Sequence, residues 1–149
     1  MKPFTIACCQ LRALDLEDAE INLKTILSLL DEAGEQRANL VILPECSYPA
    51  YYVKSQSPYS APGVQSYDEI CKLLGQKARQ YGYWLVAGLA VPEKNGALTN
   101  SGIVFDPSGN QCGRYDKTFL WHFDNNWFEP GQTFPVFETP FVNFGILIC

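Results

Sequence analysis

Histidine is nearly absent from this chain of 149 residues, because His122 is the only one. Six cysteines are spread over positions 8, 9, 46, 71, 112 and 149, and no two of them have the CxxC spacing. Structural zinc sites usually take closely spaced Cys and His ligands. The sequence therefore predicts neither a metal nor a cofactor, and His122 cannot be assumed to act as a catalytic base.

Long apolar runs are also missing, since no stretch approaches the ~20 apolar residues of a membrane span. The amino-terminal segment has one lysine and a short apolar run that ends at Gln10, without the longer apolar region and cleavage site of a signal peptide. We therefore expect a cytoplasmic protein without a membrane partner. In that reducing compartment the cysteines other than Cys149 are expected to be free, buried thiols, Cys8 and Cys71 among them.

Basic residues are in the minority, with 11 Lys and Arg against 16 Asp and Glu and a formal net charge of −5. Surfaces that bind nucleic acid are normally basic, so nucleic acid is not an expected partner. No GxGxxG or Walker-type glycine-rich loop follows either of the early strand-like segments. A nucleotide-binding domain is therefore a weak interpretation.

Strand-like and helical patterns alternate along the chain. Residues 4–9 (FTIACC) and 39–43 (NLVIL) are short apolar runs typical of buried strands. A helix between them is indicated by apolar residues at helical spacing, namely Leu23, Ile26, Leu27, Leu30 and Ala33. A strand–helix–strand order predicts parallel strands joined by a right-handed crossover.

The rest of the chain contains one more helix and several strands. Residues 47–65 predict a long loop, and Ser66 with Glu69 has the spacing of a capping box at the start of a second helix. The expected strands are 83–88, a hairpin of 99–105 and 111–115 around DPSGN, 135–139, and 144–148. The strongly apolar final strand is of the kind that lies centrally in a sheet.

Two helices are few for about six strands, because an α/β sheet normally buries both faces. We therefore expect an α/β fold with a mixed sheet and helices on one face. The chain resembles the first half of a larger fold, so residues 1–149 are expected to form one incomplete domain whose carboxyl-terminal half is absent.

Three reactive side chains follow three of the predicted strands. Glu45 comes just after 39–43, Lys117 two residues after 111–115, and Cys149 directly after 144–148. Sites in α/β sheets are built beyond the carboxyl ends of strands, so these groups are expected to converge. An ammonium favours the thiolate, a carboxylate can carry the thiol proton to a leaving amine, and the lysine can stabilise an oxyanion. Taken singly, each residue more often has an ordinary role: Glu45 as a helix or loop carboxylate, Lys117 as a solvated surface lysine and Cys149 as a buried thiol.

Three segments resemble the signature segments of the nitrilase superfamily of carbon–nitrogen hydrolases: ANLVILPECSYPAYY, NSGIVFDPSGNQCGRYDKTFLW and GILIC. Gln10, Asn100 and the FEPG loop fit the same pattern. The resemblance implies an α-β-β-α sandwich about twice this length that forms homo-oligomers. It also implies that Glu45 is the general base, Lys117 the oxyanion-stabilising lysine and Cys149 the nucleophile.

The resemblance is weaker at a second glutamate, which many amidase-type members carry between the lysine and the loop that FEPG resembles. The matching position here is Asp124, one methylene shorter, with Glu129 as the less favoured substitute. An Asx turn in HFDNN is an equally good interpretation of Asp124. Among the loop aromatics, Tyr51 and Trp121 are candidate walls of a substrate pocket or plain packing residues.

The resemblance favours cleavage of a linear amide or an N-carbamoyl compound, because the pattern typical of true nitrilases does not follow Lys117. We expect the 149 residues alone to be inactive, since the residue after such a nucleophile usually supplies an oxyanion N–H. The alternative is a non-catalytic interaction module that a partner chain completes.

Overall fold

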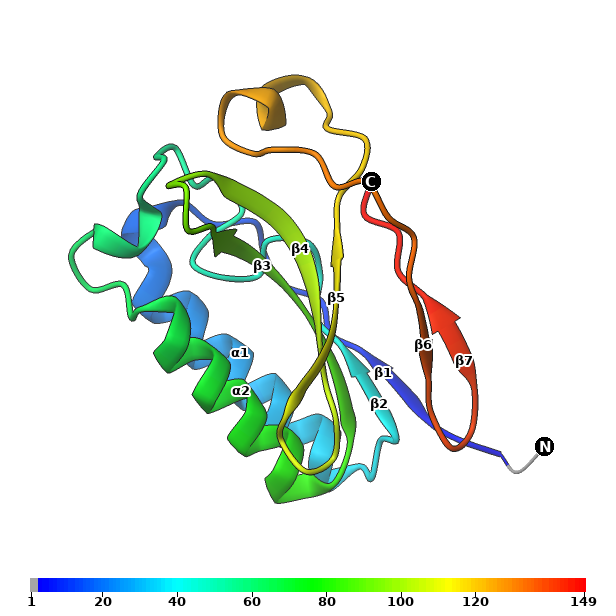
Figure 1. Cartoon of the computed structure of the whole chain (residues 1–149). Coiled ribbons are helices and arrows are strands. Elements are labelled where there is room, and N and C mark those ends of the chain that lie inside the picture. Colours follow the sequence, from blue (N-terminus) through cyan, green and yellow to red (C-terminus); the bar gives the residue numbers. More distant parts are fainter. Residues whose placement is uncertain (1–2) are drawn as a thin grey trace.

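The computed structural model describes residues 3–149 and contains two helices against one face of a twisted sheet. Figure 1 shows helices α1 (Ala19–Glu35) and α2 (Tyr67–Tyr81) side by side on that face. The sheet has the order β1-β2-β3-β4-β5, and the first two pairings are parallel while the last two are antiparallel. Its strands are β1 (Ile6–Cys8), β2 (Leu40–Ile42), β3 (Trp84–Pro92), β4 (Leu98–Phe105) and β5 (Gln111–Asp116). The mixed sheet with helices on one face is the architecture that the sequence predicts.

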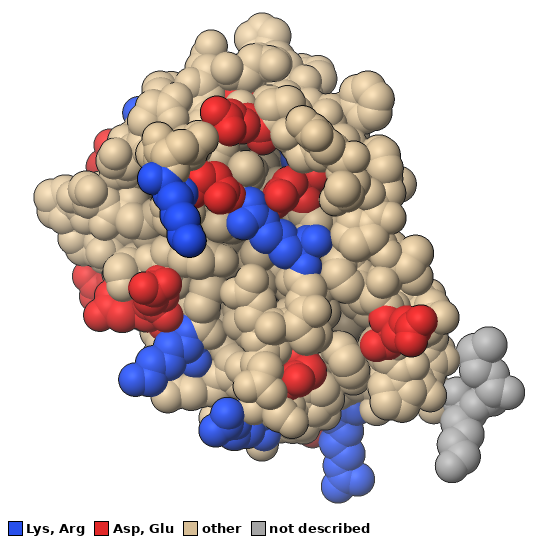
Figure 2. Space-filling view, in the orientation of Figure 1, with Lys and Arg blue, Asp and Glu red and all other residues tan. Residues whose placement is uncertain are grey.

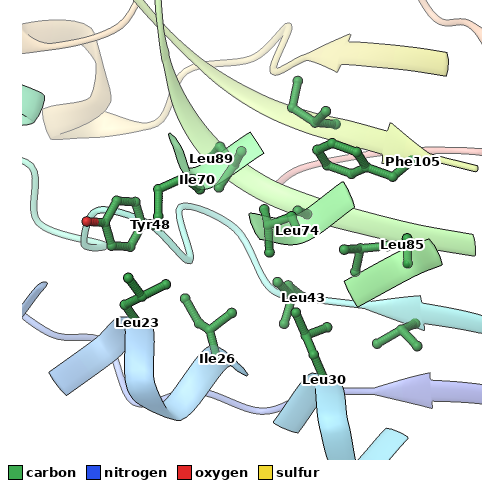
Figure 3. Close-up of a cluster of buried hydrophobic side chains, with 14 of the residues drawn as sticks. Leu23, Ile26, Leu30, Leu43, Tyr48, Ile70, Leu74, Leu85, Leu89 and Phe105 are labelled. Atoms are coloured by element: carbon green, nitrogen blue, oxygen red, sulfur yellow. The ribbon is translucent and has the colours of Figure 1, made fainter. Parts of the chain in front are cut away.

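The main core lies between the two helices and the sheet (Figure 3). The apolar face of α1 contributes Leu23, Ile26 and Leu30, all nearly inaccessible to solvent. Their spacing of three and four residues places them on one side of the helix, toward the sheet. Across from them, Leu85 and Leu89 both lie on the helix-facing side of β3, because residues separated by an even number of positions share one face of a strand. This core fixes the sheet on which the site is built.

Helix α2 begins and ends with signals that the sequence carries locally. The main-chain N–H of Glu69 donates to Ser66 Oγ at 3.3 Å, and the Glu69 carboxylate accepts from the main-chain N–H of Ser66 at 2.9 Å. This reciprocal pair is the predicted capping box. The helix ends at Gly82, whose φ of 70° lies in the left-handed region that favours glycine.

Short 3₁₀ helices occupy the connecting loops: η1 (Leu16–Asp18), η2 (Pro58–Ser60) and η3 (His122–Asn126). The acidic residues Glu17 and Asp18 fall in η1, directly before α1. η2 lies within the predicted loop 47–65. η3 forms part of the loop that follows β5 and contributes to the site described below.

The face of the sheet away from the helices is covered in part by a hairpin of β6 (Val136–Glu138) and β7 (Asn143–Gly145). Phe137, Phe144 and Ile146 pack there against Val86 and Val104. The prediction of a central strand over 144–148 is wrong, because β7 ends at Gly145 and pairs only with β6 in a separate two-stranded sheet. A tight connection, in which Thr139 N–H donates to Val142 O at 3.2 Å, holds β7 to β6.

The expected burial of the first strand and of most cysteines also needs correction. β1 is the edge strand of the sheet, and Ile6 and Cys8 are exposed while Ala7 packs toward the core. Cys112, on the opposite edge strand β5, is exposed, and Cys9 and Cys71 are half-buried. An edge strand has a neighbour on one side only, so its apolar residues are not necessarily covered.

No helix within residues 3–149 combines the length and the apolar character that a membrane crossing requires.

Candidate active site

The turn that carries Glu45 lies directly across strand β3. Leu43 N–H donates to Val86 O at 2.9 Å and Ser47 N–H to Gly88 O at 2.7 Å, so the chain stays bound to β3 beyond the end of β2. A Cβ atom on Gly88 would lie 2.1 Å from Pro44 O and 2.9 Å from Glu45 Cα. Only glycine at position 88 allows this approach, which fixes the backbone of Glu45.

The main chain of Lys117 forms hydrogen bonds to β4 on one side and to the FEPG loop on the other. Its N–H donates to Asn100 O at 2.8 Å, and its carbonyl accepts from Gly131 N–H at 2.9 Å. A Cβ atom on Gly131 would lie 2.3 Å from Asp116 O, so this loop also depends on a glycine. Glu129 N–H donates to Leu98 O at 2.8 Å and ties the loop to β4.

The side chains of Glu45, Lys117 and Asp124 meet in one ionic cluster. The Nζ atom of Lys117 donates to Glu45 Oε1 and to Asp124 Oδ2, both at 2.6 Å. The side chains of Lys117 and Asp124 are 2% and 6% exposed, and that of Glu45 is 19% exposed. A lysine buried to this degree is compensated by two carboxylates, as a buried charge requires.

The ammonium form of Lys117 is favoured in this cluster. Burial by itself would lower the pKa of Lys117, but the hydrogen bonds and charges of Asp124 and Glu45 outweigh it and raise the pKa above its ordinary value. Lys117 is therefore a fixed positive charge at neutral pH, suited to stabilising a negative charge that develops nearby.

Asp124 and Glu129, the two positions left open for a second carboxylate, lie in different surroundings. Asp124 is buried in η3 and accepts from both Lys117 Nζ and the main-chain N–H of Trp121, the latter at 3.2 Å. Glu129 is exposed and lines an open depression with Arg114 and Glu93. The η3 turn brings the shorter aspartate within reach of the lysine.

The depression beside Glu129 is a mixed-charge region rather than a basic patch. Arg114 forms ion pairs with Glu93 and with Asp116, the latter at 2.6 Å. Figure 2 shows acidic and basic groups side by side in the upper part of the viewed face. The charges in this region therefore largely neutralise one another.

Tyr51 and Trp121 differ in their relation to the cluster. A cavity of about 300 Å³ lies beside Glu45 and is lined by Tyr51, Ser47 and the 11–13 segment, among others. Trp121 has a side chain 63% exposed, with its ring edge-to-face against Phe123 at a centroid distance of 5.7 Å. Its main-chain N–H donates to Asp124 Oδ2 of the cluster at 3.2 Å.

Cys149 is exposed, and no hydrogen bond of its thiol occurs among residues 3–149. The segment leading to it is fixed, because Ile146 packs directly over Gly102 of β4. In Figure 1 the chain after β7 rises toward the end of the sheet where β5 finishes. Three residues from Ile146 can span at most about 10 Å. Figure 1 shows the carboxyl terminus beside the loop that follows β5, at the end of the sheet that holds Lys117.

Two residues of the site were not among those predicted to be functional. Asn100 is fully buried on β4, and its Nδ2 donates to Glu45 Oε1 at 2.6 Å. Its signal in the sequence is its fit to the nitrilase-superfamily pattern, to which no role was attached. Cys46, next to Glu45, is buried, and burial followed by the charges of Glu45 and Asp124 raises its pKa, so this thiol is held in the protonated form.

The sequence matches the carbon-nitrogen hydrolase family over residues 5–149, and the chain belongs to that family. It is 32% identical over 139 residues to omega-amidase NIT2 of Xenopus tropicalis, covering 86% of this chain and 49% of the relative. It is 36% identical over 124 residues to a nitrilase of Pyrococcus abyssi, covering 81% of this chain and 46% of the nitrilase. The chain thus spans about half the length of these curated relatives.

Solved structures support the same assignment. An amidase from Nesterenkonia sp. superposes with a TM-score of 0.81 at 27% identity, over 97% of this chain and 54% of the amidase. One mutant of that amidase is described in complex with butyramide. It superposes with a TM-score of 0.79 at 28% identity, over 95% of this chain and 54% of the mutant amidase. Another shows covalent addition of the acetamide moiety of fluoroacetamide at the active-site cysteine. The mixed α/β fold of this chain is therefore that of the nitrilase-superfamily amidases.

Proposed function

We propose that this chain supplies the catalytic residues of an amidase, with Glu45 as general base, Lys117 as oxyanion stabiliser and Cys149 as nucleophile. The observation that carries the proposal is the buried Lys117–Glu45 pair, joined at 2.6 Å. Membership of the carbon-nitrogen hydrolase family supports it. So does the direction of the segment that ends at Cys149.

The chemistry divides into two steps. In the first, Glu45 takes the thiol proton of Cys149, the sulfur attacks the amide carbon, and the C–N bond breaks as Glu45 returns the proton to the leaving amine. In the second, water loses a proton to Glu45 and attacks the thioester, which releases the carboxylic acid and restores the thiol. Lys117 stabilises the oxyanion formed in each step.

Asp124 binds the same Nζ atom of Lys117 as Glu45 does. A lysine bound by two carboxylates loses most of its rotational freedom, so its ammonium is pre-positioned before the substrate arrives. Asp124 therefore takes the place that the resemblance gives to a second glutamate, and Glu129 does not.

The proposed substrates are linear amides or N-carbamoyl compounds. The omega-amidase name of the relatives and the butyramide complex of the Nesterenkonia amidase support an amide. The cavity of about 300 Å³ next to Glu45 is at the small end of ligand pockets, which fits a short acyl chain beside Tyr51. The whole protein is proposed to be a cytoplasmic homo-oligomer, and the 149 residues alone are proposed to be inactive.

The test measures ammonia release from butyramide and from an N-carbamoyl amino acid by the natural polypeptide at its full length. Wild type should release ammonia, Cys149→Ala should release none while still binding butyramide, and Lys117→Ala should lose roughly 10²–10³-fold in kcat. Residues 1–149 alone should be inactive. Turnover in Cys149→Ala would exclude this cysteine as the nucleophile.

A non-catalytic interaction module is the second candidate function. Phe134, Val136 and Leu147 are all more than half exposed in and around the β6–β7 hairpin, as expected of a surface that another chain covers. A natural full-length polypeptide that hydrolyses neither substrate, yet forms a stable complex through this hairpin, would favour the module.

A further inference from the structure

Asn100 binds the same oxygen of Glu45 as the lysine does. Its Nδ2 lies 2.6 Å from Glu45 Oε1, and Lys117 Nζ lies 2.6 Å from that same atom. Within residues 3–149, no hydrogen bond to Glu45 Oε2 is found. The two donors thus distinguish two oxygens that are chemically equivalent in a free carboxylate.

The location of Asn100 makes this arrangement rigid. Asn100 is fully buried on β4, between β3 and β5, and its carbonyl accepts the main-chain N–H of Lys117 at 2.8 Å. Asn100 therefore binds the backbone of Lys117 and the side chain of Glu45, the two partners of the ion pair. Gly102 lies two residues after Asn100, on the same face of β4. Ile146, three residues before Cys149, packs over Gly102.

Packing alone does not account for an asparagine here. The Oδ1 atom of Asn100 is buried and has no hydrogen-bond partner among residues 3–149. A buried acceptor without a partner lowers stability, and an apolar residue of similar size would avoid that cost. Ala90 and Leu98 lie in the apolar cluster nearest to this position, so an apolar side chain would find similar neighbours.

We propose that Asn100 is a positioning residue that fixes Oε1 of Glu45 together with Lys117 and so leaves Oε2 as the oxygen that accepts the thiol proton. This inference rests on the proposed function, because it assigns an orientation to the general base of that reaction. Without Asn100, the carboxylate rotates about its last bond, and the basic oxygen is directed at the thiol for only part of the time.

The test compares Asn100→Leu with Ser101→Ala in the full-length natural polypeptide. Ser101 is equally buried on the same strand, but its hydroxyl donates to Asp116 Oδ1 at 2.5 Å, away from Glu45. Asn100→Leu should lower kcat for butyramide about 10- to 100-fold, by analogy with the loss of outer-shell hydrogen-bond partners at metal sites, with KM little changed. Its melting temperature should stay within a few degrees of wild type, because removal of the unpaired Oδ1 offsets loss of the hydrogen bond to Glu45. Ser101→Ala should keep kcat within about 3-fold.

The outcomes separate the inference from the proposed function. If wild type is active, Cys149→Ala is inactive and Asn100→Leu keeps its kcat, the proposed function stands and the positioning role is wrong. If kcat and melting temperature fall together in Asn100→Leu, Asn100→Ser is measured as a smaller polar variant. Equal recovery of both quantities in Asn100→Ser would then show a purely structural role and overturn the inference. Absence of hydrolysis by wild type overturns the proposed function and this inference with it.

Discussion

The Nζ atom of Lys117 lies 2.6 Å from Oε1 of Glu45, although 72 residues separate the two along the chain. One residue follows the edge strand β5, and the other follows β2, three positions away in the sheet. The pair exists because the turn after β2 crosses β3 at Gly88 while the main chain of Lys117 is bound to Asn100 of β4.

Replacing Lys117 by methionine should destabilise the protein strongly. The change leaves Asp124 and Glu45 without their shared counter-ion, and breaking a buried pair in this way typically costs about 3–5 kcal/mol. We expect the lower end, about 3 kcal/mol, because Glu45 keeps some exposure. Urea unfolding measures the loss. Lys24→Met, which removes an exposed ion pair to Glu20, is the control and should leave the unfolding midpoint unchanged.

The stabilisation by Lys117 should depend on pH in one direction. Since its pKa is raised on folding, the folded state holds the proton more tightly than the unfolded state does. The contribution is therefore complete below the unfolded value of about 10.4 and is lost as pH rises through the folded-state pKa. The difference between wild type and Lys117→Met should stay constant from about pH 7 to 9 and shrink by about pH 11. A difference that grows with pH would contradict this account.

Gly88→Ala should displace the turn that carries Glu45. The new Cβ atom would lie 2.1 Å from Pro44 O, so the turn that carries Glu45 must move. Overpacking of this kind costs about 1–3 kcal/mol, and the displaced base should lower kcat as well. Gly145→Ala serves as the control, because its nearest contact would be at 3.8 Å. Equal kcat for the two variants would show that the close approach at Gly88 is not needed.

The cysteines should differ widely in reactivity. Cys8 is exposed, whereas Cys46 is buried and has a raised pKa caused first by burial and then by nearby carboxylates. Iodoacetamide labelling near pH 8, followed by peptide mass spectrometry, should modify Cys8 and leave Cys46 intact until denaturant is added. Modification of native Cys46 as fast as Cys8 would mean that the turn around Glu45 opens readily.

Asp124→Asn should impair catalysis while Glu129→Gln should not. Asp124 binds the ammonium of Lys117 directly, and its neutralisation frees the lysine to move away from the substrate. We expect at least a 10-fold loss of kcat for Asp124→Asn, in the range seen for supporting partners of a reactive group. Glu129→Gln is the matched control, because that carboxylate is exposed. A loss of activity in Glu129→Gln alone would reverse the assignment.

Local features and the candidate chemistry of this protein could be predicted from the pattern of residues. The capping box of Ser66 and Glu69 depends only on residues a few positions apart, as does the DPSGN turn, where Asp106 accepts from the main-chain N–H of Ser108 at 2.8 Å. Glu45 and Lys117 were recognisable because each follows a predicted strand, whereas Asp124 was a candidate only through the resemblance to the nitrilase superfamily. Such signals are short-range, so a pattern of residues is enough to find them.

Tertiary structure alone decided which of these residues meet and which surfaces are covered. It placed Asp124 rather than Glu129 on Lys117, brought Asn100 to Glu45 across 55 residues, and left Cys8 exposed on an edge strand. It also paired Phe144 and Gly145 with β6 in a separate hairpin and left residues 146–148 outside any strand. Apolar runs reveal that a segment is to be buried, but the partner that buries it is chosen by long-range packing and hydrogen bonding, which no local pattern records.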